Sequence, residues 1–213
     1  MLELKIRYSI SEDMLEKIKE IEEKLSKIHI EEQNKKINIS TKSRVRSVYS
    51  SLAIEDNPLS LETVEKITKD KLVLAKRTDV QEVKNANELY ENMDNYNYLN
   101  EEDFLKAHLL LMKYFEDDNG TYRSHDEGVK KYDEIIFMAP DSILVPTFMN
   151  NLFIFINENN NIVHPIILSA IFHYYLVYIH PFTDENEPLG QQKTYLQKYL
   201  QNKGFTDFGK SFF

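Results

Sequence analysis

The chain has 213 residues, of which 42% are hydrophobic and 12% aromatic, so it is long and apolar enough for one folded domain and too apolar for disorder. The absence of cysteine excludes disulfides, thiolate metal sites and a cysteine nucleophile. The net charge of −9 argues against nucleic acid and membranes as direct partners, because nucleic acid and anionic lipid repel a protein of this sign.

The N-terminal residues predict a separate element, residues 1–40. They carry charges where a signal peptide needs an apolar run, so we expect a cytoplasmic protein. Residues 2–10 alternate and predict a short strand, and Ser11 then caps an amphipathic helix. The apolar seam of that helix could pack on the main domain or on a second copy of the chain, forming a homodimer; it consists of Met14, Ile18, Ile21, Leu25 and Ile28.

Residues 31–42 predict a polar linker, and residues 41–213 predict one mostly α, bundle-like domain with a small inserted hairpin near residues 132–138. The helix that follows Pro165 is apolar almost all round, which predicts a buried central helix. Helix starts and stops are marked along the chain by Asn57 and Pro58, Ser60, Asn100, Pro146 and Pro165.

The segment HPFTDENEPLGQ, residues 180–191, joins this central helix to a last helix that begins near Pro188. A helix N-terminus offers free N–H groups and a positive dipole end to phosphate. A histidine beside such a site could act as general base, and Asp184 could hold Mg²⁺ through one oxygen.

The residues alone also allow simpler readings. His180 could hydrogen-bond the last carbonyls of its helix, and the acidic residues could form a solvated loop or a metal site without nucleotide. His173, seven residues earlier, is expected to be a packed, hydrogen-bonded core histidine rather than half of a metal pair with His180. His108, which lies among leucines and phenylalanines, is expected to be core as well.

At this loop the chain resembles the Fic family (filamentation induced by cAMP), whose motif reads HPFx[D/E]GNGRxxR. SSLAIEDNPLS, residues 50–60, resembles the family's inhibitory motif [S/T]xxxE[G/N], on a helix expected at about residues 44–57. Further similar stretches follow in family order: GTYRSHDEGV, MAPDSILVP and HPIILSAIFHYYLVYIHPF. The resemblance covers residues 40–200 approximately, and it implies the Fic fold, a helical bundle with a short β-hairpin flap.

The resemblance implies transfer of AMP from ATP to a hydroxyl side chain of a target protein, with Mg²⁺ as the metal. By this resemblance His180 would take the proton of the attacking hydroxyl, and Asp184 would hold Mg²⁺. Asn186 and Gly190 would contact phosphate. Ser51 and Glu55, four residues apart, would form the inhibitory pair. A flap would clamp the target by strand addition; it consists of Ile135, Ile136, Phe137 and Met138.

Four motif positions differ: Glu185 and Glu187 replace the two glycines, and Pro188 and Gln191 replace the two arginines. A pair of unit charges at 4 Å interacts with about 1 kcal/mol in water and roughly 4 kcal/mol at an effective dielectric constant of 20. We therefore expect weakened ATP binding. The resemblance implies that Glu55 would pair with the second motif arginine and so keep the γ-phosphate out. Because Gln191 stands at that position and offers only a neutral hydrogen bond, we also expect that this inhibitory ion pair is lost.

Two functions follow from this mixture of kept and lost positions. The first is a weak adenylyltransferase that acts on an unknown target protein. The alternative is an inactive Fic-fold pseudoenzyme that serves as a binding or regulatory module. A third interpretation attributes the divergent loop to an altered or truncated gene, because the tail GFTDFGKSFF lacks the helices and winged domain that many relatives carry there.

Overall fold

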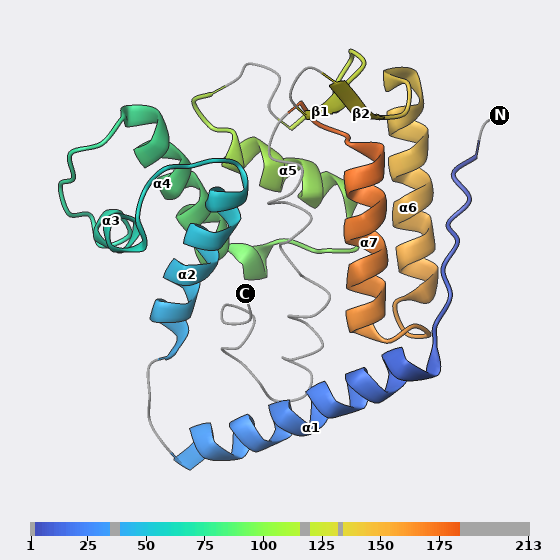
Figure 1. Ribbon diagram of the computed structural model, residues 1–213, viewed down its shortest axis with the longest axis horizontal. Coiled ribbons are helices and arrows are strands. Elements are labelled where there is room, and N and C mark those ends of the chain that lie inside the picture. The colour runs from blue at the N-terminus through green and yellow to red at the C-terminus, as the bar shows by residue number, and fades with distance from the viewer. Residues whose placement is uncertain (1–2, 35–38, 116–119, 132–133, 184–213) are drawn as a thin grey trace.

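The structure is a computed structural model that describes residues 3–34, 39–115, 120–131 and 134–183 (Figure 1). Within these residues it contains seven α-helices and one two-stranded sheet, which confirms the prediction of a mostly α fold. None of the described helices is long and apolar enough to cross a bilayer. In chain order the elements are α1 (Glu12–Asn34), α2 (Ile39–Ile54), α3 (Leu61–Ile67), α4 (Arg77–Glu91), η1 (Met93–Asn95), α5 (Glu101–Leu111), β1 (Gly128–Lys131), β2 (Glu134–Met138), η2 (Ser142–Leu144), α6 (Val145–Asn159) and α7 (Pro165–Ile179).

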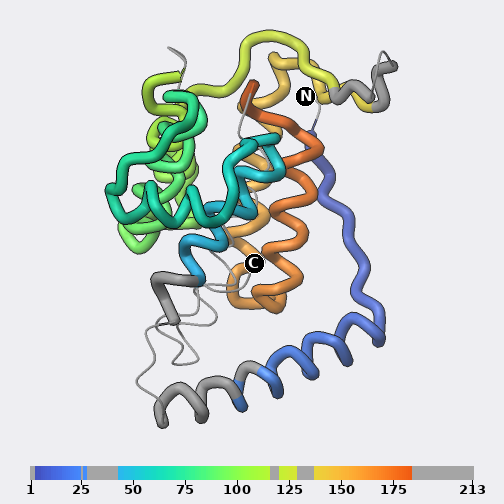
Figure 2. The backbone as a smooth tube through the Cα atoms, turned by 60° about the vertical axis from the view of Figure 1, so that its left-hand side comes forward, coloured from blue at the N-terminus to red at the C-terminus, as the bar shows by residue number. Residues whose placement is uncertain are grey.

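The core lies between two groups of helices, one formed by α2, α4 and α5 and the other by the adjacent pair α6 and α7 (Figures 1 and 2). Helix α2 contributes Val48 and Leu52, which are fully buried, to this core. The predicted helix starts at Ser60, Asn100, Pro146 and Pro165 are confirmed as well.

The central helix α7 is less enclosed than its sequence predicts. Seven of its residues are buried, yet Tyr174 is 64% exposed and Tyr178 is 39% exposed. Both tyrosines lie one helical turn apart on the same side of α7. Their rings can face solvent at small cost because each carries a polar hydroxyl.

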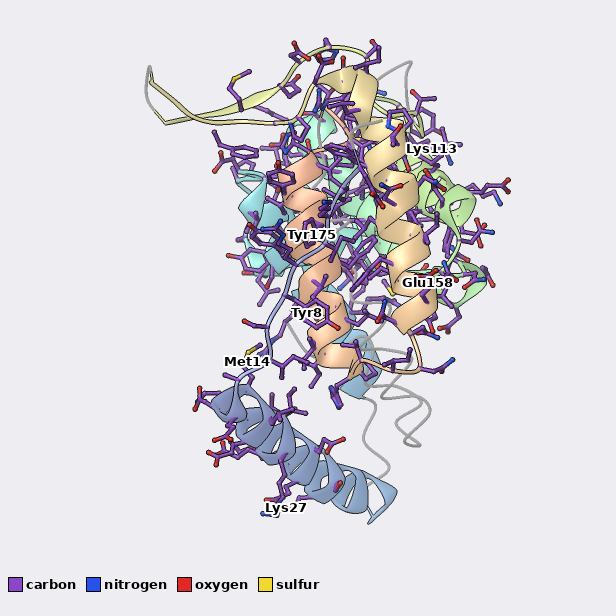
Figure 3. All side chains as sticks on the ribbon, turned by 90° about the vertical axis from the view of Figure 1, so that its right-hand side faces the viewer. Tyr8, Met14, Lys27, Lys113, Glu158 and Tyr175 are labelled. Carbon is purple, nitrogen blue, oxygen red and sulfur yellow. The ribbon has the colours of Figure 1, made fainter. Side chains whose placement is uncertain are left out.

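The predicted strand over residues 2–10 is wrong: residues 3–11 run extended beside α6 and α7 without pairing to any described strand (Figures 2 and 3). The N–H of Arg7 donates to the hydroxyl of Tyr175 (2.7 Å), and that hydroxyl lies 3.3 Å from the carbonyl of Arg7. A side chain therefore satisfies backbone groups that a strand would offer to a neighbouring strand.

Helix α1 begins as predicted, with the N–H of Met14 donating to the Ser11 hydroxyl (3.2 Å). Only part of its seam is covered, because Ile18 is buried while Met14 and Ile21 are about two-fifths exposed. The side chains of Leu25 and Ile28 lie outside the described part of the chain. The linker predicted over residues 31–42 is wrong at both ends, since α1 reaches Asn34 and α2 begins at Ile39. The domain boundary at residue 40 stays a prediction.

The hairpin is present, but it begins at Gly128, earlier than predicted. Its strands are antiparallel, with Val129 opposite Phe137 and Lys130 opposite Ile135. Ile136 has no partner in this register, which is the arrangement of a β-bulge. The N–H of Ala139 donates to the carbonyl of Glu127 (3.0 Å) and closes the base of the hairpin.

Replacing a leucine in the core should destabilise the protein far more than replacing a leucine in the loop between α3 and α4. Leu89 is fully buried, whereas Leu74 is 106% exposed. We expect Leu89→Ala to lower the free energy of unfolding by about 2–5 kcal/mol. Leu74→Ala, the matched control, should change it by less than about 0.5 kcal/mol. Urea denaturation followed by circular dichroism measures both, and equal losses would contradict this core assignment.

Candidate active site

Helix α7 ends because the next residue, His180, adopts a left-handed backbone conformation (φ 49°, ψ 61°). Its N–H still donates to the carbonyl of Leu176 (2.8 Å). A left-handed conformation costs a residue with a side chain about 1–2 kcal/mol, so surrounding contacts must hold it. The structure thus places the predicted catalytic histidine at the end of a buried helix, as the sequence predicted.

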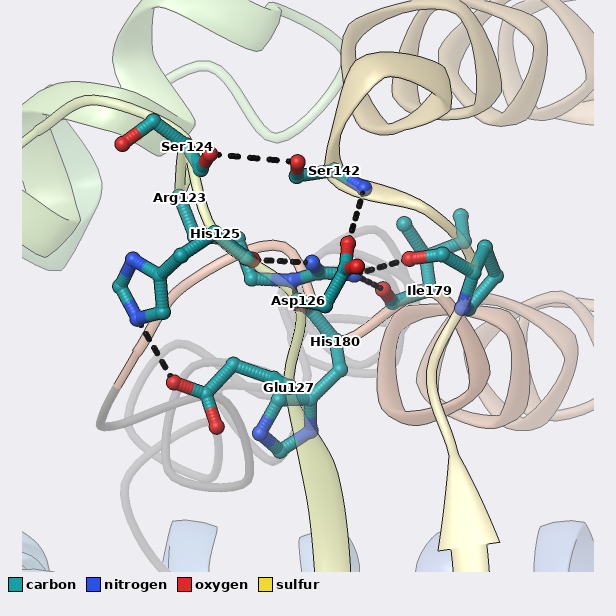
Figure 4. A network of polar contacts seen from close by, with 9 residues as sticks. Arg123, Ser124, His125, Asp126, Glu127, Ser142, Ile179 and His180 are labelled. Atoms are coloured by element: carbon teal, nitrogen blue, oxygen red, sulfur yellow. Dashed lines mark hydrogen bonds and ion pairs between the residues drawn. The ribbon is translucent and has the colours of Figure 1, made fainter.

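Arg123 provides these contacts (Figure 4). Its side chain is 5% exposed. Its Nε donates to the carbonyl of His180 (2.7 Å), and Nη2 donates to that of Ile179 (3.3 Å). The N–H of Arg123 donates to the carbonyl of Pro181 (2.9 Å). One residue therefore binds three consecutive carbonyls at the end of α7.

The same guanidinium also binds the base of the hairpin. Nη1 donates to the carbonyl of His125 (2.6 Å), before β1, and Nη2 donates to that of Pro140 (2.5 Å), after β2. Burial lowers the pKa of Arg123, and the carboxylates of Asp126 and other nearby acids oppose that shift. The acids thus help to keep a buried cation charged.

Further hydrogen bonds join the turn around Arg123 to η2 and join residues within the turn. The N–H of Ser142 donates to a carboxylate oxygen of Asp126 (3.2 Å), and the Ser142 hydroxyl donates to the carbonyl of Ser124 (3.2 Å). The ring of His125 lies 2.8 Å from the carboxylate of Glu127. The two Ser142 contacts lie on the side that faces α6, whereas the contact between His125 and Glu127 lies on the other side (Figure 4).

Two residues after His180, Phe182 anchors the beginning of the loop in the core. Its side chain is 1% exposed and stacks on the His108 ring, with centroids 3.7 Å apart and planes 6° apart. Nδ1 of His108 accepts a hydrogen bond from the N–H of Gly120 (3.0 Å), which confirms that His108 is a core residue. Tyr122 also packs on Phe182 and donates to the carboxylate of Glu101 (2.6 Å); burial and this carboxylate raise the pKa of Tyr122.

The two residues of the expected inhibitory pair lie at the C-terminal end of α2. Ser51 is buried in α2 and shares a hydrogen bond with the hydroxyl of Tyr90 on α4 (2.9 Å). Glu55 lies one residue beyond the end of α2, so the helix expected to reach residue 57 ends three residues earlier. Asp56 ends it with a left-handed conformation (φ 61°). This conformation favours glycine or asparagine, which are the residues that the Fic motif prefers at that position.

Several predicted site residues lie outside the described residues: Asp184, Glu185, Asn186, Glu187, Pro188, Gly190 and Gln191. Among the residues that the structure describes, no group of three or more histidines and acids could hold a metal. His173 and His180 are seven residues apart, which corresponds to about 10 Å along a helix and is too long for a shared ion. His173 was expected to be a hydrogen-bonded core histidine, but its Nδ1 is buried and forms no hydrogen bond within the described chain.

The expected flap is β2, whose backbone is described, although the side chains of Ile135 and Ile136 are not. Met138 is 55% exposed, and the Phe137 ring lies 6.0 Å from that of Tyr178 on α7. The flap therefore contacts the helix that carries His180. Whether it clamps a target stays a prediction.

Sequence reasoning missed Arg123 and Tyr90. The partners of Arg123 are backbone carbonyls up to 57 residues away, and no side-chain pattern marks a carbonyl. The sequence did offer one signal for Arg123, because this arginine lies in GTYRSHDEGV, a stretch that resembles the Fic family. Tyr90 could have been found from its spacing, because it lies seven residues after Val83 and so on the same face of a helix.

A family model described as Fic/DOC family matches residues 98–190, which run from just before α5 through the hairpin, α6 and α7 and past His180. The protein adenylyltransferase Fic of Nematostella vectensis is 26% identical over 189 residues, 83% of this chain and 42% of that protein. A solved structure of a Fic family protein from Desulfovibrio desulfuricans has a TM-score of 0.86 and 33% identity, and the match covers 97% of this chain and 64% of that one. Fic-1 from C. elegans, with a TM-score of 0.62 and 21% identity over 90% of this chain and 61% of that one, shares the fold. This chain thus spans less than half of the curated relative and less than two thirds of these solved structures.

The Ser51–Tyr90 hydrogen bond should contribute measurably to stability. Ser51→Ala would leave the Tyr90 hydroxyl without its partner in the core, so we expect a loss of about 1–3 kcal/mol in the free energy of unfolding. Tyr90→Phe should also destabilise, and the double variant should lose less than the sum of the two single losses. Ser50→Ala, at a half-buried neighbour that forms no hydrogen bond within the described residues, is the control. Strict additivity in urea denaturation would show that the two hydroxyls do not interact.

The stability that Tyr90 contributes should depend on pH. Burial raises the pKa of Tyr90, and the hydrogen bond with Ser51 offsets part of that rise. An unfolded tyrosine ionises near pH 10, so the contribution should be complete below pH 10 and decline above it. We expect the difference in unfolding free energy between the wild type and Tyr90→Phe to shrink by up to about 1.4 kcal/mol per pH unit above pH 10. Urea denaturation from pH 8 to 12 tests this, and a constant difference would contradict it.

Proposed function

We propose, from the premise that this chain is a Fic-domain protein, that it transfers AMP from ATP to a hydroxyl side chain of another protein. The observation that carries this proposal is the position of His180 at the left-handed end of a buried α7, in a chain similar over most of its length to a protein adenylyltransferase. The target protein is not identified by these features.

The chemistry of the step assigns one role to His180. The target hydroxyl oxygen would form a bond to the α-phosphorus of ATP, the bond between that phosphorus and the bridging oxygen would break, and pyrophosphate would leave. The hydroxyl proton would pass to the His180 imidazole, which is the side chain most often used as a general base. A fixed backbone at His180 supports this role because proton transfer needs a positioned base.

The donor and the metal would be held by the loop after Phe182. Asp184 is a hard carboxylate ligand suited to Mg²⁺, which would supply positive charge next to the phosphates. Asn186 and Gly190 would contact phosphate through an amide and an N–H group. Glu185 and Glu187 would place two negative charges beside a polyanion, and we propose that this weakens nucleotide binding.

A second candidate function rests on the same substitutions. Without the two motif arginines, which Pro188 and Gln191 replace, the chain lacks the bidentate groups best suited to hold a triphosphate. The fold would then serve as a binding or regulatory module with no transfer activity. Calorimetry with ATP and Mg²⁺ separates the two functions: a dissociation constant in the micromolar range contradicts the module.

Labelling with ATP that carries a radioactive α-phosphate tests transfer directly. We expect weak labelling of the protein itself or of a lysate protein in the presence of Mg²⁺ or Mn²⁺, and its loss in His180→Ala. His164→Ala is the matched control, because His164 caps the opposite end of α7. Glu55→Gly should change labelling little if Gln191 no longer pairs with Glu55. Absence of labelling in the wild type and in Glu55→Gly would reject the transferase.

A further inference from the structure

The contacts at the end of α7 assign a role to a residue outside the Fic loop motif. We propose that Arg123 is a positioning residue that holds His180 in its left-handed conformation and joins it rigidly to the base of the hairpin. The catalytic part of this inference rests on the proposed function, whereas the structural part does not.

The first support is the match between a strained backbone and a set of donors. A positive φ at a residue with a side chain persists only where its surroundings fix it. Here the carbonyls of Ile179, His180 and Pro181 all accept hydrogen bonds from Arg123, at 3.3, 2.7 and 2.9 Å. If His180 turned back to a right-handed helical conformation, its carbonyl would leave the Nε donor.

The second support is that the same guanidinium reaches the hairpin on both sides. His125 precedes β1 and Pro140 follows β2, and their carbonyls accept from Nη1 and Nη2. A movement of the hairpin base would therefore displace the Arg123 guanidinium, which also donates to the carbonyl of His180. A target protein bound at β2 would lie at a fixed position relative to the imidazole.

The third support concerns the type of residue. Arginine has five donors in one planar group, and here four carbonyls from three chain segments share them. Lysine has three donors on a single nitrogen and cannot span these positions. The His180 imidazole points away from the guanidinium (Figure 4), so Arg123 acts through the backbone of His180 and does not touch the reacting atoms.

The test compares Arg123→Lys and Arg123→Gln with Arg77→Lys, the same change at an exposed arginine. A proton–carbon NMR correlation spectrum of the histidine rings reports the environment of His180. The His180 signal is identified as the one that disappears in His180→Gln. In the folded Arg123 variants we expect the His180 signal to shift and broaden and the amides of β2 to exchange about tenfold faster. The His164 signal, from the other end of α7, should stay in place. A folded Arg123→Lys with the wild-type His180 signal and wild-type hairpin exchange overturns the proposal.

A measurement on the wild type guards against variants that do not fold. The Nε–H of Arg123 donates to a buried carbonyl, so it should exchange with solvent far more slowly than that of Arg77. Rapid exchange of the Arg123 Nε–H would overturn the proposal without any substitution.

Kinetics then tests the catalytic part. If the wild type transfers AMP, Arg123→Lys should lower kcat about 10- to 100-fold and leave KM for ATP unchanged. An unchanged kcat in that variant overturns the positioning role. If the wild type transfers nothing, the proposed function fails, while the spectra and the exchange data still decide whether Arg123 fixes His180.

Discussion

The left-handed turn at His180 is the constraint on which the arrangement of this site depends. It ends α7, directs the chain toward the loop that resembles a phosphate-binding motif, and returns Phe182 to the core against His108. Such a turn is unfavourable for histidine by itself. It is maintained by hydrogen bonds to Arg123 on one side and by the buried aromatic anchor on the other. The position of His180 and the packing of the core are therefore parts of one structure.

The expected inhibitory segment illustrates how a motif can persist as structure. Ser51 is occupied by its hydrogen bond with Tyr90, so it contributes to the packing of α2 against α4. Asp56 has a left-handed backbone, which glycine and asparagine adopt most easily, and these are the residues preferred at this position of the motif. The left-handed residue after α2 is therefore present in a chain that we propose has lost the ionic partner of Glu55.

The helices could be predicted from sequence because their signals are local. Apolar spacing, the caps Ser60 and Asn100, and the prolines that begin α6 and α7 depend on neighbouring residues alone. The position of His180 could be predicted because it lies within a recognisable motif. The strand over residues 2–10 was predicted wrongly because alternation alone does not reveal that Tyr175, far along the chain, satisfies the backbone of Arg7. Arg123 was missed for a similar reason, since its partners are carbonyls of distant segments.

The most direct measurement is a crystal structure of this chain grown with a high concentration of ATP and Mg²⁺. We expect His180 to have a positive φ, the Arg123 guanidinium to bind the carbonyls of His180 and Pro140, and any bound nucleotide to have its α-phosphate beside the imidazole. Nucleotide bound at full occupancy away from His180 would contradict the proposed chemistry. A right-handed His180, with Arg123 turned into solvent, would contradict the structural basis of the whole account.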